Sequence, residues 1–171
     1  MSANPKAATS GLSAELLRPM TLASLDGVVA LEAAIYPFPW TRGNFVDSLA
    51  AGYTAWTLNG SGGELIAYCV AMRGVGEMHL LNITVAPVAR RRGHARRLLG
   101  ELVALCRQER VDRLWLEVRQ ANLDAQATYR RLGFEPVGVR KGYYPAPAGS
   151  REDAVVMSLG IDAAGRFDAL E

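Results

Sequence analysis

Apolar positions recur with the period of a helix in the middle of the chain. Counted from Ala95 as position i, the apolar residues lie at i+3, i+4, i+7, i+8 and i+11, the last of which is Cys106. This spacing puts all of them on one face of a helix. The pattern predicts a long amphipathic helix. A shorter run with the same period over residues 24–36 predicts an earlier helix, for which Ser24 is the expected N-cap.

Shorter apolar runs elsewhere predict strands, over residues 14–20, 53–59, 64–73, 77–86, 113–118, 134–140 and 152–159. The stretch YPFPW at 36–40 ends the first helix, because two of its residues are prolines, and Thr41 should cap a short second helix. Asn122 should cap a last helix that ends at Gly133.

The order of these elements sets the fold class. Strand 77–86, the long helix and strand 113–118 form a β-α-β crossover, so the two strands should be parallel, and the neighbouring hairpins should be antiparallel. The sequence therefore predicts an α/β fold in which a mixed sheet carries helices on both faces. We expect one domain over residues 13–160, with flexible tails at 1–12 and 161–171.

Composition narrows the class of protein. Of the 171 residues, 50% are apolar, which is typical of a globular domain, and a net charge of +2 is small for a general nucleic-acid binder. Cys69 and Cys106 lie outside any metal-binding spacing, so we expect neither a disulfide nor a metal site. The chain shows no membrane-span-length apolar run and no secretory signal, so we expect a cytoplasmic protein that binds no membrane. We also expect a monomer, and the small net charge disfavours binding to nucleic acid.

The stretch RRRGHA at 90–95 joins a predicted strand to the long helix. The first N–H groups of a helix have no internal partner and the helix dipole is positive there, which favours phosphate. Gly93 would let a ligand approach the backbone closely. The GxxxxGK[ST] and GxGxxG patterns are absent. The stretch predicts a site for a phosphate-rich ligand, and a solvated basic patch is the alternative.

RRRGHA also fits the Q/R-x-x-G-x-G/A motif of the GNAT acetyltransferases, and it stands at the same point between strand and helix. The element order resembles the fold of that family over about residues 14–160, which implies a mostly antiparallel twisted sheet of six or seven strands. The resemblance implies acetyl-CoA as co-substrate. YPFPW, LLNITV, LWLEVRQANLDAQATYRRLGF and YYPAPAGSREDAVVMSL resemble the RimI-type members, which acetylate the N-terminal alanine of a small-subunit ribosomal protein.

Glu117 is the candidate general base. It shares one face of its strand with Trp115, opposite Leu114 and Leu116. A carboxylate in a short apolar strand needs a partner or a task, and an ion pair with a nearby arginine is the structural alternative. The resemblance implies the catalytic role. About a tenth of a free α-amine is already neutral at pH 7, so a modest base is enough.

Tyr129 is the candidate proton donor. From the residues alone, a core tyrosine with a satisfied hydroxyl is the commoner case. A phenol with a pKa near 10 can nevertheless protonate a thiolate with a pKa near 8.5. In the family, the tyrosine at this position of A-x-x-x-Y has that role.

The resemblance assigns further residues to acetyl-CoA. Strand residues contribute through their main chain, Asn122 contacts the CoA arm as well as capping its helix, and the side chain of His94 should face solvent. The expected set is Ile83, Thr84, Val85, Arg90, Arg91, Arg92, Gly93, His94, Ala95, Arg96 and Asn122.

Two aromatic segments are expected to select the substrate, with Tyr36, Phe38, Trp40, Tyr143, Tyr144 and Arg151 as the contact residues. A hydrophobic plug and a packed hairpin turn are the structural alternatives. The resemblance favours a groove for the N-terminal segment of a ribosomal protein.

The leading prediction is therefore N-terminal protein acetylation by direct transfer, without a covalent acyl-enzyme. Acetylation of a lysine or of a small-molecule amine, and a non-catalytic acyl-CoA-binding module, are the alternatives. RNA binding by the arginine cluster alone would show a steep dependence on salt, and the small net charge disfavours it.

Overall fold

The structure, a computed structural model, describes residues 15–162, which contain a seven-stranded sheet in the order β1-β2-β3-β4-β5-β7-β6. The strands are β1 Leu16–Pro19, β2 Thr54–Asn59, β3 Leu65–Arg73, β4 Glu77–Val85, β5 Arg113–Arg119, β6 Glu135–Pro145 and β7 Arg151–Gly160. The α-helices are α1 Leu25–Ile35, α2 Arg42–Ala50, α3 His94–Gln108 and α4 Leu123–Arg131. Three short 3-10 turns are η1 Leu22–Ser24, η2 Pro87–Ala89 and η3 Pro147–Gly149.

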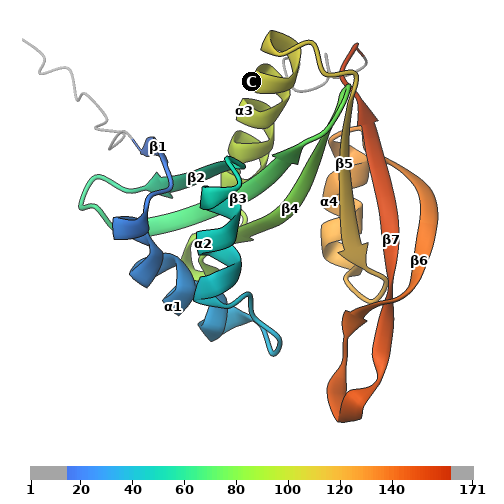
Figure 1. The fold of residues 1–171 in the computed structure, drawn as a ribbon, viewed down its shortest axis with the longest axis horizontal. Helices are drawn as coiled ribbons and strands as arrows, with labels where there is room; N and C mark the ends of the chain where they lie inside the picture. Colours follow the sequence, from blue (N-terminus) through green and yellow to red (C-terminus); the bar gives the residue numbers. More distant parts are fainter. Residues whose placement is uncertain (1–14, 163–171) are drawn as a thin grey trace, which may run out of the picture.

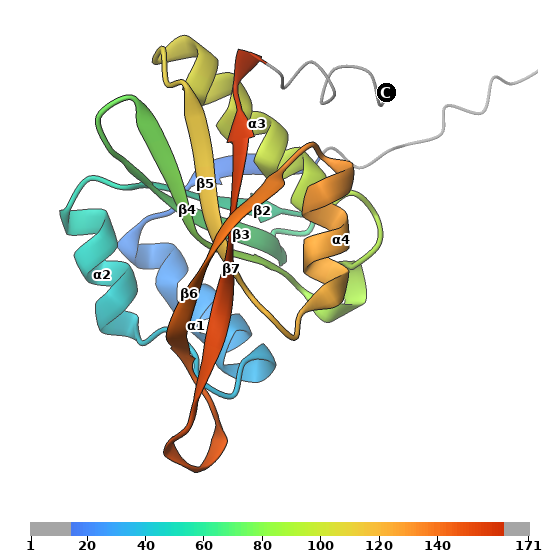
Figure 2. The ribbon, with the colours of Figure 1, turned by 90° about the vertical axis from the view of Figure 1, so that its right-hand side faces the viewer.

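The pairing confirms the predicted fold class. β4 and β5 are parallel and α3 connects them, while the other pairs in the sheet are antiparallel (Figure 1). Helices α1 and α2 cover one face of the sheet, and α3 and α4 cover the other (Figure 2). The sheet is thus mixed, mostly antiparallel and covered on both faces.

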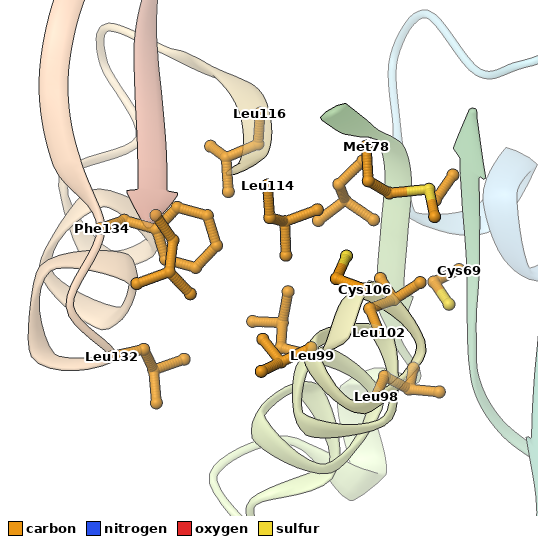
Figure 3. Close-up of a cluster of buried hydrophobic side chains, with 14 of the residues drawn as sticks. Cys69, Met78, Leu98, Leu99, Leu102, Cys106, Leu114, Leu116, Leu132 and Phe134 are labelled. Atoms are coloured by element: carbon orange, nitrogen blue, oxygen red, sulfur yellow. The ribbon is translucent and has the colours of Figure 1, made fainter. Parts of the chain in front are cut away.

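The apolar stripe of α3 forms the centre of the larger core. Leu98, Leu99, Leu102 and Cys106 are fully buried, as the helical period predicted. They pack with side chains from β3, β4 and β5 (Figure 3). Burying a leucine side chain stabilises a fold by about 1.5–3 kcal/mol, so this helix is a main source of stability.

Predicted helix caps are partly confirmed. The amide of Asn44 donates to the hydroxyl of Thr41 at 3.3 Å, and the amide of Ala125 donates to the side chain of Asn122 at 3.1 Å. Ser24 stands at the N-cap position of α1 as predicted, but its side chain makes no capping bond there, because its hydroxyl donates to the carbonyl of Thr21 at 2.8 Å.

The hairpin of β6 and β7 is longer than the sequence indicated. The predicted loop 141–151 shrinks to residues 146–150, because Tyr144 pairs with Glu152 and Pro145 pairs with Arg151. The two tyrosines of this hairpin therefore lie in a strand.

The predicted tails, 1–12 and 161–171, lie outside the described residues, apart from Ile161 and Asp162. Ile161 is buried, and its amide donates to the carbonyl of Asp112 at 3.0 Å. No helix within residues 15–162 is long and apolar enough to cross a membrane.

A β-bulge in β4 opens the centre of the sheet. Val70 of β3 pairs with Asn82 and Ala71 pairs with Leu80, so Leu81 is an extra residue in β4. The ladder between β4 and β5 ends at the pair of Leu80 with Leu116, and the two strands separate beyond it (Figure 1). The bulge thus places a gap between two otherwise paired strands.

Candidate active site

A cavity of about 520 Å³ lies where β4 and β5 separate. Both strands, the end of α1 and the segment after it, α4 and the end of β6 contribute to its wall. Eight of the predicted site residues line it: Tyr36, Phe38, Trp40, Ile83, Glu117, Asn122, Tyr129 and Tyr144. The structure therefore brings together residues that are widely separated in the sequence.

The free edge of β4 borders this cavity. The amide of Ala86 donates to the carbonyl of Ile66 in β3 at 2.8 Å, and backbone groups alternate in direction along an antiparallel strand. Thr84 therefore turns its backbone toward β3, whereas Ile83 and Val85 turn theirs toward the gap. The guanidinium of Arg90 donates to the carbonyl of Val85 at 3.3 Å. The amide and carbonyl of Ile83 are thus placed to pair with an extended ligand.

Glu117 lies on β5 at the wall of the cavity, and only 9% of its side chain is exposed. A guanidinium nitrogen of Arg140 lies 3.3 Å from its carboxylate. The ion pair considered from the sequence is therefore present. The hydroxyl of Tyr144 donates to the backbone carbonyl of Glu117 at 2.9 Å, which joins β6 to β5 beside the site.

Tyr129 projects from α4 into the same cavity and is half-buried. Its ring packs edge-on against Phe134, with 5.7 Å between ring centroids. Burial, with a smaller contribution from Tyr36, raises the pKa of the Tyr129 phenol well above its ordinary value. The hydroxyl therefore stays protonated at neutral pH and can donate a proton.

The β6–β7 hairpin is attached to β5 by a charged contact. Arg119 lies 2.8 Å from the carboxylate of Glu152, whose other oxygen accepts the amide of Ala121 at 2.9 Å. These bonds, the amide first, lower the pKa of Glu152. The guanidinium of Arg119 also lies 4.5 Å from the ring centre of Tyr144.

Two of the predicted substrate residues, Tyr143 and Arg151, do not line the cavity. Arg151 donates across the hairpin to the carbonyls of Gly142 and Tyr143, the latter at 2.7 Å. Tyr143 packs edge-on against Tyr144 at 5.0 Å. Both residues thus shape the hairpin that carries Tyr144.

A buried carboxylate that was not among the predicted site residues also lies at the cavity. Glu32 of α1 is 2% exposed and accepts hydrogen bonds from the hydroxyl of Tyr68, the side chain of Asn82 and the amide of Trp40, the last at 2.9 Å. Its position on an otherwise apolar helical face was the only signal in the sequence.

The network continues from Asn82 to the cavity. The hydroxyl of Thr84 donates to the side-chain oxygen of Asn82 at 3.2 Å, and the hydroxyl of Tyr36 lies 3.0 Å from that of Thr84. Asn82 and Tyr36 line the cavity, whereas Thr84 is 2% exposed. Thr84 therefore belongs to the site through its side chain as well as its strand.

The arginine-rich loop lies at the start of α3. Arg91 and Gly93 have φ angles of 61° and 86°, in the left-handed region that favours glycine, and α3 begins at His94. Arg90, Arg91 and Arg92 are exposed. A hollow of about 410 Å³ is lined by Glu15, Arg92, Gly93, His94, Arg96, Arg97 and Gly100. Arg90, Arg91 and Ala95 do not line it.

The expectation that His94 faces solvent is wrong, because only 8% of it is exposed. Its Nδ1 atom lies 3.3 Å from the carboxylate of Glu15, which Arg97 also contacts at 2.9 Å. Glu15 precedes β1, so a local pattern around the loop could not reveal this contact.

The cysteines lie in the core. Burial raises the pKa of the Cys69 thiol to about 12 and that of the Cys106 thiol to about 11, so both stay protonated. Neither lines the cavity. Within residues 15–162, no group of three or more His, Cys, Asp or Glu side chains could hold a metal ion.

Comparisons with known proteins agree with this architecture. A sequence model of the acetyltransferase (GNAT) family matches residues 25–134. The [ribosomal protein bS18]-alanine N-acetyltransferase of Haemophilus ducreyi is 36% identical over 129 residues, which cover 75% of this chain and 88% of that protein. The Escherichia coli K12 protein of the same name is 36% identical over 137 residues, covering 80% of this chain and 91% of that protein. The crystal structure of the Escherichia coli ribosomal-protein-S18-alanine N-acetyltransferase matches with a TM-score of 0.79 at 32% identity, covering 86% and 94% of the two chains.

Proposed function

Because the chain belongs to the GNAT acetyltransferase family and is thus an acyltransferase, we propose that it acetylates the N-terminal alanine of ribosomal protein bS18. Several relatives are named for this reaction. The observation that carries the proposal is the placement of Glu117 and Tyr129 at one cavity, where β4 and β5 separate. Under this proposal the protein is a cytoplasmic monomer, with residues 13–160 as its single domain.

The residues present fit acetyl-CoA as the co-substrate. The amide and carbonyl of Ile83 face the gap and can form hydrogen bonds with the amides of an extended pantetheine arm, in the same way that one strand pairs with another. The first amides of α3 suit a pyrophosphate, and the nearby side chains of Arg92 and Arg96 suit further phosphate charge. Asn122 caps α4 and still lines the cavity. Bound acetyl-CoA supplies an acetyl group activated as a thioester.

The chemistry needs one proton acceptor and one proton donor. The substrate nitrogen forms a bond to the acetyl carbon as the carbon–sulfur bond breaks. Glu117 accepts the proton that the nitrogen loses, directly or through a water, and Tyr129 supplies a proton to the departing sulfur. The raised pKa of Tyr129 keeps its proton in place until that step. The products are the acetylated amine and the CoA thiol.

Direct transfer is supported by the state of the two cysteines. A covalent acyl-enzyme on cysteine would need a reactive thiolate at the cavity. Cys69 and Cys106 are both buried in the core, and their thiols stay protonated.

The wall of the cavity suits a peptide end. Tyr36, Phe38 and Trp40 form one aromatic side, which two prolines stiffen, and Tyr144 contributes from the hairpin on the other side. A peptide between these two segments would present its first residue to Glu117.

A thiol-release assay tests the proposal. Acetyl-CoA would be supplied with one of two peptides that share the N-terminal sequence of bS18, one with a free α-amine and the other blocked but bearing a lysine. We expect thiol release with the free α-amine alone. Release with lysine alone would move the function to side-chain acetylation, and silence with both would reject the proposed function.

A further inference from the structure

We propose that the phenol oxygen of Tyr36 accepts a hydrogen bond from the substrate amine, and that the buried carboxylate of Glu32 enforces this polarity. Tyr36 is then a specificity-determining residue that orients the attacking nitrogen, and Glu32 is a positioning residue that acts through a chain of hydrogen bonds. The inference rests on the proposed function and adds to it how the amine is held.

The chain of hydrogen bonds starts at Glu32. The two oxygens of the Glu32 carboxylate accept the hydrogen bonds of its neighbours. The amide of Trp40, the hydroxyl of Tyr68 and the side chain of Asn82 surround it, and all three carry a hydrogen to give. Asn82 must therefore turn its NH₂ group toward Glu32, at 3.3–3.4 Å from the two oxygens.

That orientation fixes the hydroxyl of Thr84. With its NH₂ group on Glu32, Asn82 presents its oxygen to Thr84, which donates to it at 3.2 Å. The hydroxyl of Tyr68 donates its hydrogen to Glu32 and likewise offers only an oxygen to its other neighbours. The single hydrogen of Thr84 is therefore used on the side away from the cavity.

Tyr36 must then donate to Thr84 across their 3.0 Å contact. Burial raises the pKa of Tyr36, so its phenol keeps the hydrogen that this bond needs. Because that is its only hydrogen, any polar contact from Tyr36 to the contents of the cavity uses an oxygen lone pair. The cavity thus has an acceptor at Tyr36, although a tyrosine can usually donate as well.

An acceptor at this position suits the amine and does not suit the acetyl donor. The thioester carbonyl and the phosphates of acetyl-CoA have no hydrogen to give, whereas the amine nitrogen carries several. Attack requires the nitrogen lone pair to point at the acetyl carbon, so its N–H groups must point elsewhere. Glu117 and Tyr36 line the same cavity and together provide two acceptors that would fix this direction.

The test is peptide binding to protein saturated with CoA, so that no turnover occurs. Calorimetry would compare the free-amine bS18 peptide with the same peptide that carries propionyl in place of the first alanine and so lacks the amine. Tyr36→Phe should lower the affinity for the free-amine peptide about tenfold. It should leave the affinity for the amine-free peptide unchanged. Tyr53→Phe, which alters a half-buried tyrosine outside the cavity, is the matched control.

Substitutions of the residues that bond to Tyr36 directly or through the chain of hydrogen bonds show whether hydrogen-bond direction or side-chain shape determines the amine preference. Thr84→Val keeps the side-chain shape but frees the hydroxyl of Tyr36, so it should also reduce the preference for the amine severalfold. Thr84→Ser keeps the hydroxyl and should restore the preference. Glu32→Gln replaces one of the two oxygens that accept these three donors by an NH₂ group, so it should weaken the amine preference in the same direction as Thr84→Val. The dissociation constant of acetyl-CoA should stay within about twofold in every variant, and thermal unfolding would confirm that each is folded.

An unchanged amine preference in Tyr36→Phe would overturn the proposal, as would an equal loss for both peptides, which would show a role in shape alone. Loss in Tyr36→Phe with no loss in Thr84→Val would overturn the role of the network. If the wild-type protein prefers the free-amine peptide but does not acetylate it, the proposed function fails while the role of Tyr36 stands. If it binds neither peptide, both proposals fail.

Discussion

The two faces of the sheet differ in what packs against them. Against α3 and α4 the core is apolar, with Leu99 and Leu102 at its centre (Figure 3). Against α1 and α2 the apolar cluster is smaller and contains the bonded pair of Tyr68 and Glu32. Apolar packing has no direction, whereas a buried carboxylate demands donors at defined positions. One face therefore provides stability, and the other holds groups in fixed orientations.

The candidate active site joins these two faces. Glu117 lies on the side of β5 opposite the core residues Leu114 and Leu116, whereas Tyr129 packs against the edge of the larger core. In an unbroken sheet such residues would be separated by the strands themselves. The bulge at Leu81 and the gap beyond it let the proposed proton acceptor and the proposed proton donor reach one cavity from opposite faces.

The largest expected effect comes from Glu117. Glu117→Gln keeps the shape of the side chain and removes the proton acceptor, so turnover should fall about 10²- to 10⁴-fold. Acetyl-CoA affinity and thermal stability should stay close to wild type. Steady-state kinetics with the bS18 peptide would measure this, with the exposed Glu101→Gln as the control. Unchanged turnover would remove Glu117 from the mechanism.

A substitution in the apolar core beneath α3 should have the opposite effect to Glu117→Gln, with a loss of stability and little change in turnover. Leu102→Ala leaves a cavity in the larger core and should lower the free energy of unfolding by about 2–5 kcal/mol. Turnover per folded molecule should change little, because no group at the active-site cavity is altered. Urea unfolding would measure the loss, and Leu22→Ala, at a position 61% exposed, is the matched control. Equal losses in the two variants would contradict the assignment of this core.

Much of the apolar face could be predicted from the sequence, because its pattern is local. The period of α3 and the strands on either side of it sufficed to predict the crossover and the parallel pair. The β6–β7 hairpin was predicted with strands that were too short, because nothing local shows that Tyr144 pairs with Glu152.

The polar face could be predicted only in part. Tyr36 and Glu117 were identified from motifs, but the hydrogen bonds between Glu32 and Asn82 join segments far apart in the sequence. The bulge depends on register between β3 and β4, which composition does not encode. The contact of His94 likewise involves Glu15, the first of the described residues and far from His94 in the sequence.

Tyr129 offers a test of how the two faces cooperate. Tyr129→Phe removes the proton donor but keeps the ring against Phe134. The rate should fall about 10- to 100-fold, and acetyl-CoA affinity should fall less. Single-turnover kinetics and calorimetry would separate the two quantities, with Tyr53→Phe as the control. A pure loss of affinity would assign Tyr129 to binding instead.

The smallest expected effect concerns the hairpin at the edge of the gap. The amide of Ala121 and the guanidinium of Arg119 favour the ionised form of Glu152, so its pKa is lower in the folded than in the unfolded protein. Such a group stabilises the fold fully above its unfolded pKa of about 4.3, and the contribution is lost as pH falls through the lower folded pKa.

Glu152→Gln should therefore lower the free energy of unfolding by about 1 kcal/mol at pH 7, and by progressively less below about pH 4. Urea unfolding of wild type and variant across this range would measure the difference, with the substitution of an exposed glutamate, Glu101→Gln, as the matched control. A difference that stays constant with pH would show that Glu152 acts through packing alone. A difference that vanishes in acid would show that a charge holds the hairpin to β5, so that even the rim of the active site depends on directional bonds.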